Sequence, residues 1–406
     1  MRLPLLMTLI LVFICLLTDI YIYRCITRRC VRHRKFWQRF QIISSAILNI
    51  GIIAFIALPR RNGSDLQLLT ISWALYTYLS IFIPKLVFVV FDLLASLPRI
   101  FKRKRIMIIV YTGIAVAILI FLAMWWGALI NRYRVDVKEI TTEMPHLPEQ
   151  FDGYRIVQIS DLHVGTYGKN PRYLEKVVER INSLDPDLIV FTGDLVNRRT
   201  SELRPFVSTL SKLHAKDGVF SILGNHDYGD YSDWRSPKLK EENLDNLKRL
   251  QKDMGWHLLL DRTEIITRDS ASIALIGVEN IGDPPFKEYG SLERAYPYTR
   301  NNDECKILLT HNPAHWVKSI ADNPYEKIDL TLSGHTHAMQ LTVGRWSPAK
   351  WVYPTWGGMY CDKSKEHKLY VNIGLGSVGM PMRIGATPEV TLFTLTKSPA
   401  KNCAQK

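Results

Sequence analysis

The feature that most constrains the fold of this chain is a series of long apolar stretches in its first third. There are four of them, covering residues 3–23, 42–58, 68–97 and 106–130. A helix that spans the hydrocarbon core of a bilayer needs about 20 predominantly apolar residues. The fourth stretch meets this length without a charged residue. We therefore predict a membrane domain over residues 1–135 with about four transmembrane helices.

Two of these stretches leave alternatives open. The first competes with a cleaved signal peptide, but it has only Arg2 as a basic leader and no small-residue cleavage motif, so we expect a retained helix. The third contains Lys85 and Asp92, whose spacing of seven places them on one face of a helix. We expect a buried or snorkelling pair there, and the alternative is a polar path across the bilayer.

The distribution of charge predicts the orientation of the membrane domain. Residues 1–135 contain 18 Lys and Arg against 3 Asp and Glu, so the net charge of +14 belongs to this part, and we expect no nucleic-acid partner. Cytoplasmic loops carry the excess of basic residues, and the basic segments here are 24–39 and 99–105. We therefore expect a multi-pass protein of the plasma (inner) membrane, with the residues after 130 outside the cytoplasm.

Beyond a predicted linker at residues 136–152, the pattern changes. Short apolar runs rich in branched residues end in Gly, Ser, Asp, Asn or Pro, and residues 171–184 between the first two runs have helical spacing. Strands that alternate with helices indicate an α/β domain. We predict this domain over residues 153–397, followed by a polar tail at 398–406. In such domains functional groups gather at the carboxyl ends of the strands.

Histidines and oxygen-bearing side chains follow these runs in order. Candidate metal ligands occur in five places: Asp161 and His163, Asp194, Asn225, His311, and His335 with His337. Mixed Asp, Asn and His ligands without thiolates suit Mn²⁺, Fe or Zn²⁺. So many ligands fit two ions that share a bridging carboxylate. Two ions ~3.5–4 Å apart clamp a phosphoryl group and turn bound water into hydroxide.

The order of these segments, DxH, GD, GNHD, H and GHTH, resembles the calcineurin-like metallophosphoesterases. The resemblance covers residues 154–396 and is strongest to the membrane-anchored bacterial-type branch. It implies a two-sheet sandwich flanked by helices, two divalent ions with a slight preference for Mn²⁺, and a bridging hydroxide as nucleophile. It also implies the ligand sets, in which Asp194 bridges both ions, the first ion is bound by Asp161, His163 and His337, and the second is bound by Asn225, His311 and His335.

The resemblance also implies a role for His226, which in this family donates a proton to the leaving group or holds a phosphoryl oxygen. Much of the family has Asp three residues after the bridging Asp, whereas this chain has Asn197. We expect the Asn197 amide to accept a hydrogen bond from His226, and we consider Asp227 as a second catalytic group that compensates for the missing charge. Arg383 and Asn197 are further candidates for contact with the substrate.

These observations predict a membrane-anchored hydrolase of a phosphoester or pyrophosphate bond. Tethering to the bilayer raises the local concentration of a membrane-borne substrate, and apolar residues accompany the last histidines, so we expect a lipid-linked or amphiphilic phosphorylated small molecule as substrate. These apolar residues are Met339, Trp346, Trp351 and Trp356. The alternative is a non-catalytic sensor or scaffold that binds metal and phosphate, which Asn197 alone favours. The acidic, aromatic segment 230–234 is predicted as a surface turn or a substrate gate.

Overall fold

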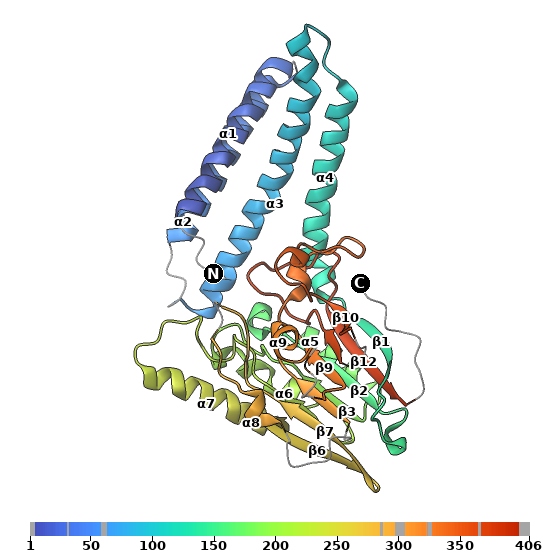
Figure 1. The fold of residues 1–406 in the computed structure, drawn as a ribbon. Coiled ribbons are helices and arrows are strands. Elements are labelled where there is room, and N and C mark those ends of the chain that lie inside the picture. The colour runs from blue at the N-terminus through green and yellow to red at the C-terminus, as the bar shows by residue number, and fades with distance from the viewer. Residues whose placement is uncertain are drawn as a thin grey trace. The chain divides into compact units, whose positions relative to one another are not determined.

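The computed structural model describes residues 5–30, 32–57, 63–284, 287–296, 305–321, 323, 327–363 and 367–397 (Figure 1). The chain divides into two compact units. The first contains residues 1–130 and 379–382, and the second contains residues 131–378 and 383–406.

The first unit contains four helices that are long and apolar enough to cross a membrane. They are α1 (Leu5–Arg29), α2 (Arg34–Ala57), α3 (Asp65–Ser96) and α4 (Met107–Leu129). The helices α1 and α2 extend into the basic segment 24–39 that the sequence places between them. Arg and Lys are good helix formers, so hydropathy marks the apolar part of such a helix rather than its end.

Buried charges in this unit pair between segments rather than with each other. The Asp19 carboxylate of α1 lies 2.9 Å from Lys85 Nζ of α3, and Asp92 of α3 accepts hydrogen bonds from Arg29 and Arg105. The predicted pairing of Lys85 with Asp92 is therefore wrong. Side chains on neighbouring helices satisfy these charges better than a residue two turns away, and such contacts hold membrane helices together.

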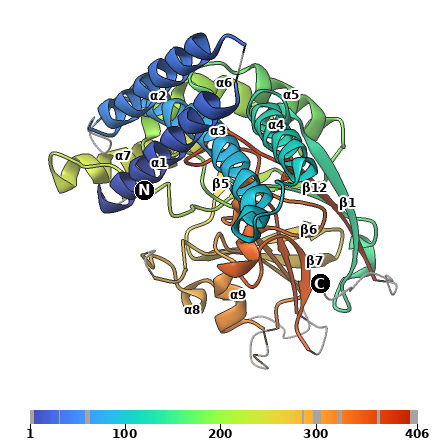
Figure 2. The same ribbon diagram turned by 90° about the horizontal axis from the view of Figure 1, so that it is seen from above.

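The second unit is built from two six-stranded sheets, with helices on their outer faces (Figures 1 and 2). The first sheet has the order β1 (Asp136–Glu143), β12 (Glu389–Thr396), β2 (Arg155–Ile159), β3 (Leu188–Phe191), β4 (Val219–Ser221) and β5 (Trp256–Leu258). The second has the order β10 (Gly358–Cys361), β11 (Lys368–Val371), β9 (Leu330–Ser333), β8 (Lys306–Leu309), β7 (Ala271–Gly277) and β6 (Arg262–Arg268). Five further α-helices in the described residues are α5 (Arg172–Asn182), α6 (Val207–Leu210), α7 (Pro237–Asp253), α8 (Leu292–Ala295) and α9 (Ala314–Ser319).

The central strands are apolar on both faces because each face packs against a different layer. In β2, Ile156 belongs to the core between the two sheets, whereas Val157 belongs to the core between the first sheet and α5. Helix α5 contributes Leu174, Val177 and Val178 to the latter core. The predicted fold class, an α/β two-sheet sandwich after an N-terminal set of apolar helices, is confirmed.

Residues 136–143, which the sequence predicts as part of a linker, instead form the edge strand β1. This strand pairs in parallel with β12, from Asp136 opposite Glu389 to Glu143 opposite Thr396. Most of its side chains stay exposed or half-buried, so it lacks the apolar run by which the inner strands are found. The remaining domain boundaries stay predictions, and the predicted tail 398–406 lies outside the described residues.

Candidate dimetal centre

Parallel strand pairing brings the predicted ligands to one edge of each sheet. The strands β2, β3 and β4 run parallel to one another, as do β8 and β9. Each predicted ligand follows the carboxyl end of one of them: Asp161 and His163 follow β2, Asp194 follows β3, Asn225 follows β4, His311 follows β8, and His335 and His337 follow β9. The structure brings all seven together, and six of them are almost fully buried.

The ligand atoms form two groups that share one carboxylate oxygen. In the first, His337 Nε2 lies 3.2 Å from Asp161 Oδ1 and 3.1 Å from His163 Nε2. In the second, His311 Nε2 lies 3.1 Å from Asn225 Oδ1 and 3.2 Å from His335 Nδ1. Asp194 Oδ2 lies 3.5 Å from His163 Nε2 and 3.2 Å from His311 Nε2. Donors this close fit around ions whose bonds are about 2.0–2.2 Å long, so the residues present fit two divalent ions.

The backbone at these residues is strained. Asp161, His163, Asp194, His335 and His337 all have positive φ values, between 41° and 75°. Non-glycine residues adopt this left-handed region at a cost, and such residues cluster at functional sites. The neighbouring glycines are required because a Cβ at Gly334 would overlap the Asp161 carboxylate and one at Gly224 would overlap that of Asp194.

The electrostatics of the site largely favour the protonation state that binds metal. Burial lowers the pKa of His163, and burial together with His311 lowers that of His335 to about 3. Burial acts to raise the pKa of Asp194, but the surrounding histidines, led by His311, lower it well below its usual value. Neutral imidazoles and ionised carboxylates are the forms that coordinate metals. His311 differs, because Asp194 outweighs the effect of burial and raises its pKa to about 9.

His226 lies beside the ligands without belonging to either group. Its ring centroid is 4.8 Å from that of His163, and its backbone N–H donates to Asp194 Oδ1 at 2.8 Å. Its Nδ1 donates to the backbone carbonyl of Asn197 at 2.6 Å. The expectation that the Asn197 amide side chain accepts this bond is therefore wrong. The main chain holds the imidazole, and the Asn197 side-chain oxygen is buried without a hydrogen-bond partner.

The structure also corrects the role expected of Asp227. Its carboxylate is buried and accepts hydrogen bonds from four backbone N–H groups, those of Asp194, Leu195, Val196 and Gly224. These contacts hold the loops after β3 and β4 against each other. Asp227 therefore positions the backbone of the ligands and is not a catalytic partner of His226.

Arg383 is likewise not available to a substrate. Its side chain is buried, and its guanidinium donates to the carbonyls of Ile373, Gly376 and Ala386. Its Nη2 lies 3.1 Å from His337 Nδ1, on the ring nitrogen opposite the one that faces the ligand group. Arg383 thus packs behind a metal ligand, and the prediction of a direct phosphate contact is wrong.

Tyr231 is a residue of the site that lies in a segment predicted as a surface turn or a substrate gate. Its ring stacks on His226 with centroids 4.1 Å apart, and its hydroxyl accepts from Asn225 Nδ2 at 2.7 Å. The second contact turns Asn225 Oδ1 toward His311. Tyr231 lies in the acidic, aromatic segment 230–234, which was the available signal. Tyr353, whose ring meets His335 edge-on at 5.7 Å, has no such signal in the sequence.

A two-sheet α/β fold with two ligand groups around a shared carboxylate is an arrangement suited to a metal-dependent hydrolase of phosphoric esters. Comparison with known families agrees. Residues 154–339 match the calcineurin-like phosphoesterase family, and residues 1–132 match the probable calcineurin-like phosphoesterase transmembrane domain. The chain belongs to the calcineurin-like phosphoesterase family, and it is a membrane protein with four candidate spans.

Three relatives illustrate the range of this family. The metallophosphoesterase YkuE of Bacillus subtilis is 31% identical over 66% of this chain and 88% of its own. A transmembrane protein with metallophosphoesterase domain from Danio rerio is 27% identical over 94% of this chain and 87% of its own. The UDP-2,3-diacylglucosamine pyrophosphatase LpxG of Chlamydia trachomatis is 29% identical over 66% of this chain and 92% of its own.

Proposed function

We propose that this phosphoesterase hydrolyses a phosphoester or pyrophosphate bond in a lipid-linked substrate, at the extracytoplasmic face of the plasma membrane. Two divalent ions, with Mn²⁺ slightly preferred, would supply a hydroxide nucleophile and charge stabilisation at the phosphoryl group. Asp161, His163 and His337 would hold the first ion, and Asn225, His311 and His335 would hold the second. Asp194, whose Oδ2 lies near both groups, would contribute to both. Because Nδ1–H is committed to the Asn197 carbonyl, His226 donates to the leaving oxygen from Nε2 as the imidazolium, a form that burial disfavours and the Asp194 carboxylate favours.

The observation that carries the lipid-linked substrate is an exposed apolar segment beside the ligands, which we name the apolar rim. It begins two residues after His337 and contains Met339, Val343, Trp346, Trp351 and Val352. Val343, Trp346 and Trp351 are 67%, 41% and 77% exposed, and the two indole rings meet at 5.3 Å. Contiguous exposed apolar groups mark interaction surfaces. The relative LpxG, named as acting on a diacylated sugar nucleotide, supports the same class of substrate.

The hydrolase activity is tested on the full-length protein in detergent. Its metal is removed with a chelator, and Mn²⁺, Zn²⁺ or Fe²⁺ is restored before hydrolysis of bis-p-nitrophenyl phosphate and p-nitrophenyl phosphate is followed. We expect Asp194→Ala to lose both bound metal and turnover. His226→Ala should keep its metal but lose roughly 10²–10⁴-fold in kcat, the usual contribution of a general acid. The matched control is Asp185→Ala, a surface carboxylate whose side chain is 84% exposed.

Full metal occupancy without turnover, on these esters and on a panel of lipid pyrophosphates, would overturn the proposal in favour of a sensor.

The lipid part is tested with the double variant Trp346→Ala, Trp351→Ala. Loss of two exposed aromatic contacts should raise KM for a lipid pyrophosphate in micelles by roughly tenfold and leave KM for p-nitrophenyl phosphate unchanged. The control is Leu239→Ala, Val317→Ala, which removes two exposed apolar side chains from other segments. Equal effects of both double variants would show that the apolar rim does not bind the lipid.

A further inference from the structure

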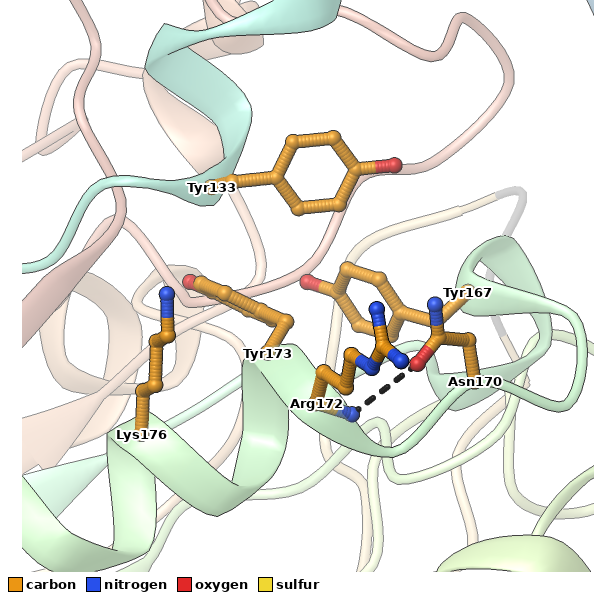
Figure 3. A pocket seen from close by; sticks show the side chains of 6 residues that line it. All are labelled: Tyr133, Tyr167, Asn170, Arg172, Tyr173 and Lys176. Atoms are coloured by element: carbon orange, nitrogen blue, oxygen red, sulfur yellow. Dashed lines mark hydrogen bonds between the residues drawn. The ribbon is translucent and has the colours of Figure 1, made fainter.

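A separate cavity lies in the second unit. It has a volume of about 220 Å³ and is lined by Tyr133, Tyr167, Asn170, Arg172, Tyr173 and Lys176 (Figure 3). We name it the tyrosine pocket. None of these residues is a candidate ligand, and the proposed hydrolysis does not use them.

The walls of the tyrosine pocket are aromatic ring faces. Tyr167 and Tyr173 both direct their hydroxyls to the carbonyl of Leu375, at 3.0 and 3.4 Å, so their hydroxyls are already engaged. The Tyr133 ring lies opposite them (Figure 3), with centroids 6.4 Å from Tyr167 and 5.8 Å from Tyr173. The three rings therefore pack against one another and form an aromatic wall of the cavity, against which a compact, partly apolar part of a ligand can lie.

The polar groups of the tyrosine pocket are hydrogen-bond donors. Arg172 and Lys176 are one helical turn apart on α5, exposed, and without an acidic partner within the described parts of the chain. The Asn170 side-chain oxygen already accepts from the backbone N–H of Arg172 at 3.1 Å, which leaves its amide donors. No carboxylate lines the cavity. Lys and Arg can only donate, so the pocket is matched to an anion that only accepts, such as a phosphate group.

A further cation lies behind the rings. Arg132 is buried, and its guanidinium carbon lies 4.6 Å from the Tyr133 ring centroid and 5.9 Å from that of Tyr167. Its Nη2 donates to the Thr166 carbonyl at 3.1 Å. A buried positive charge next to the rings adds to the field of Arg172 and Lys176, so the positive potential does not come from surface side chains alone.

The position of Tyr133 in the chain identifies the source of the phosphate. Tyr133 follows the last residue of α4, Leu129, by four residues. Four residues span at most about 14 Å, so the chain itself keeps Tyr133 close to the end of a membrane span. Tyr is enriched at membrane–water interfaces, and Arg172 and Lys176 supply the donors that a headgroup phosphate accepts. The phosphate that is always present there is the headgroup phosphodiester.

We propose that the tyrosine pocket binds the phosphodiester headgroup of an anionic phospholipid, with Arg172 and Lys176 contacting the phosphate and the rest of the headgroup lying against the aromatic wall. This is a binding site distinct from the dimetal centre, and it serves to hold the start of the second unit at the membrane surface. Binding does not require turnover, so the proposal stands independently of the substrate proposed above.

The test uses the full-length protein in detergent, titrated with dioleoyl phosphatidylglycerol or dioleoyl phosphatidylcholine and followed by native mass spectrometry. We expect tighter binding of the anionic lipid, and we expect Arg172→Ala, Lys176→Ala to weaken it by about tenfold or more, because each cation near the headgroups contributes to binding. The control Arg180→Ala, Lys212→Ala removes the same charge from exposed positions outside the cavity. Thermal melting verifies that both double variants are folded.

Three results would overturn the proposal: equal affinity of both lipids, equal weakening by the two double variants, or no effect of Arg172→Ala, Lys176→Ala. A second variant, Tyr133→Ala, tests the aromatic wall and should also weaken the binding of the anionic lipid. The last test uses inorganic phosphate in place of the lipid. If Arg172→Ala, Lys176→Ala abolishes the binding of millimolar inorganic phosphate but leaves the binding of the anionic lipid unchanged, the pocket is a site for soluble phosphate and the lipid assignment is wrong.

Discussion

At the scale of single residues, the contact between His226 and Asn197 makes a direct prediction. The imidazole Nδ1 bonds to the Asn197 carbonyl, and a carbonyl is present whatever the side chain. Asn197→Ala should therefore keep the orientation of His226 and change kcat by less than about threefold, in contrast to the 10²–10⁴-fold expected for loss of a general acid. The measurement is metal-restored hydrolysis of p-nitrophenyl phosphate. A loss as large as that of His226→Ala would show that the amide side chain has a role in catalysis.

The residues of the dimetal centre show why metal ligands are easier to predict from the sequence than the side chains that pack around them. Asp161 and His337 occur in short motifs at strand ends, and parallel strands bring such ends together. Asp227 lies in one of these motifs, but the destination of its carboxylate depends on N–H groups of a loop about thirty residues earlier. Arg383 follows a glycine-rich segment with no chemical signature. Its burial against His337 is a tertiary contact that spacing does not encode.

At the scale of elements, the helix α9 holds a buried histidine that links pH to stability. His315 is almost fully buried, its Nδ1 lies 3.0 Å from Thr310 Oγ1, and burial lowers its pKa to about 4. An unfolded histidine has a pKa of about 6.5, so the unfolded chain takes up the proton first as the pH falls. The contribution of neutral His315 to the free energy of unfolding is therefore fully present above pH 6.5 and is lost as the pH falls toward 4.

This predicts that His315→Gln reduces the pH dependence of unfolding. Between pH 7 and pH 5 the wild type should lose about 2 kcal/mol through this histidine, and the variant should not. Thermal melting of metal-stripped protein at the two pH values measures the difference, with the exposed His214→Gln as control. Equal shifts of the melting temperature between the two pH values in the wild type, His315→Gln and His214→Gln would show that His315 does not cause the pH dependence of stability.

The strands show which elements a sequence pattern can predict and which it cannot. Most inner strands are predicted from the sequence because both faces are buried and their apolar runs are continuous, although the inner strand β11 is not. The sequence predicts residues 136–143 as a linker because an edge strand needs few apolar side chains once its backbone pairs with β12. Strand β5, with only three residues, from Trp256 to Leu258, is too short to show a period.

At the scale of the whole molecule, the position of the basic connections in the membrane unit bears on its orientation in the bilayer. The basic residues of the α1–α2 connection and of the α3–α4 connection lie at the same end of the helices, because Arg29 and Arg105 both contact Asp92. The amino end of α1 and the carboxyl end of α4 therefore belong to the opposite side. This agrees with the bias of basic residues toward the cytoplasm and supports our proposal that the phosphoesterase unit is extracytoplasmic.

The orientation is tested by labelling single cysteines in intact cells with a membrane-impermeant maleimide, in a variant whose six native cysteines are replaced. Arg103→Cys lies in the α3–α4 connection and Lys397→Cys at the end of the last strand. We expect labelling at position 397 and protection at position 103 until the cells are opened, because positively charged loops are retained in the cytoplasm. The reverse pattern would place the dimetal centre in the cytoplasm and limit its substrates to the inner leaflet. The fold and the ligand groups would stand in either case, since neither depends on the side of the membrane.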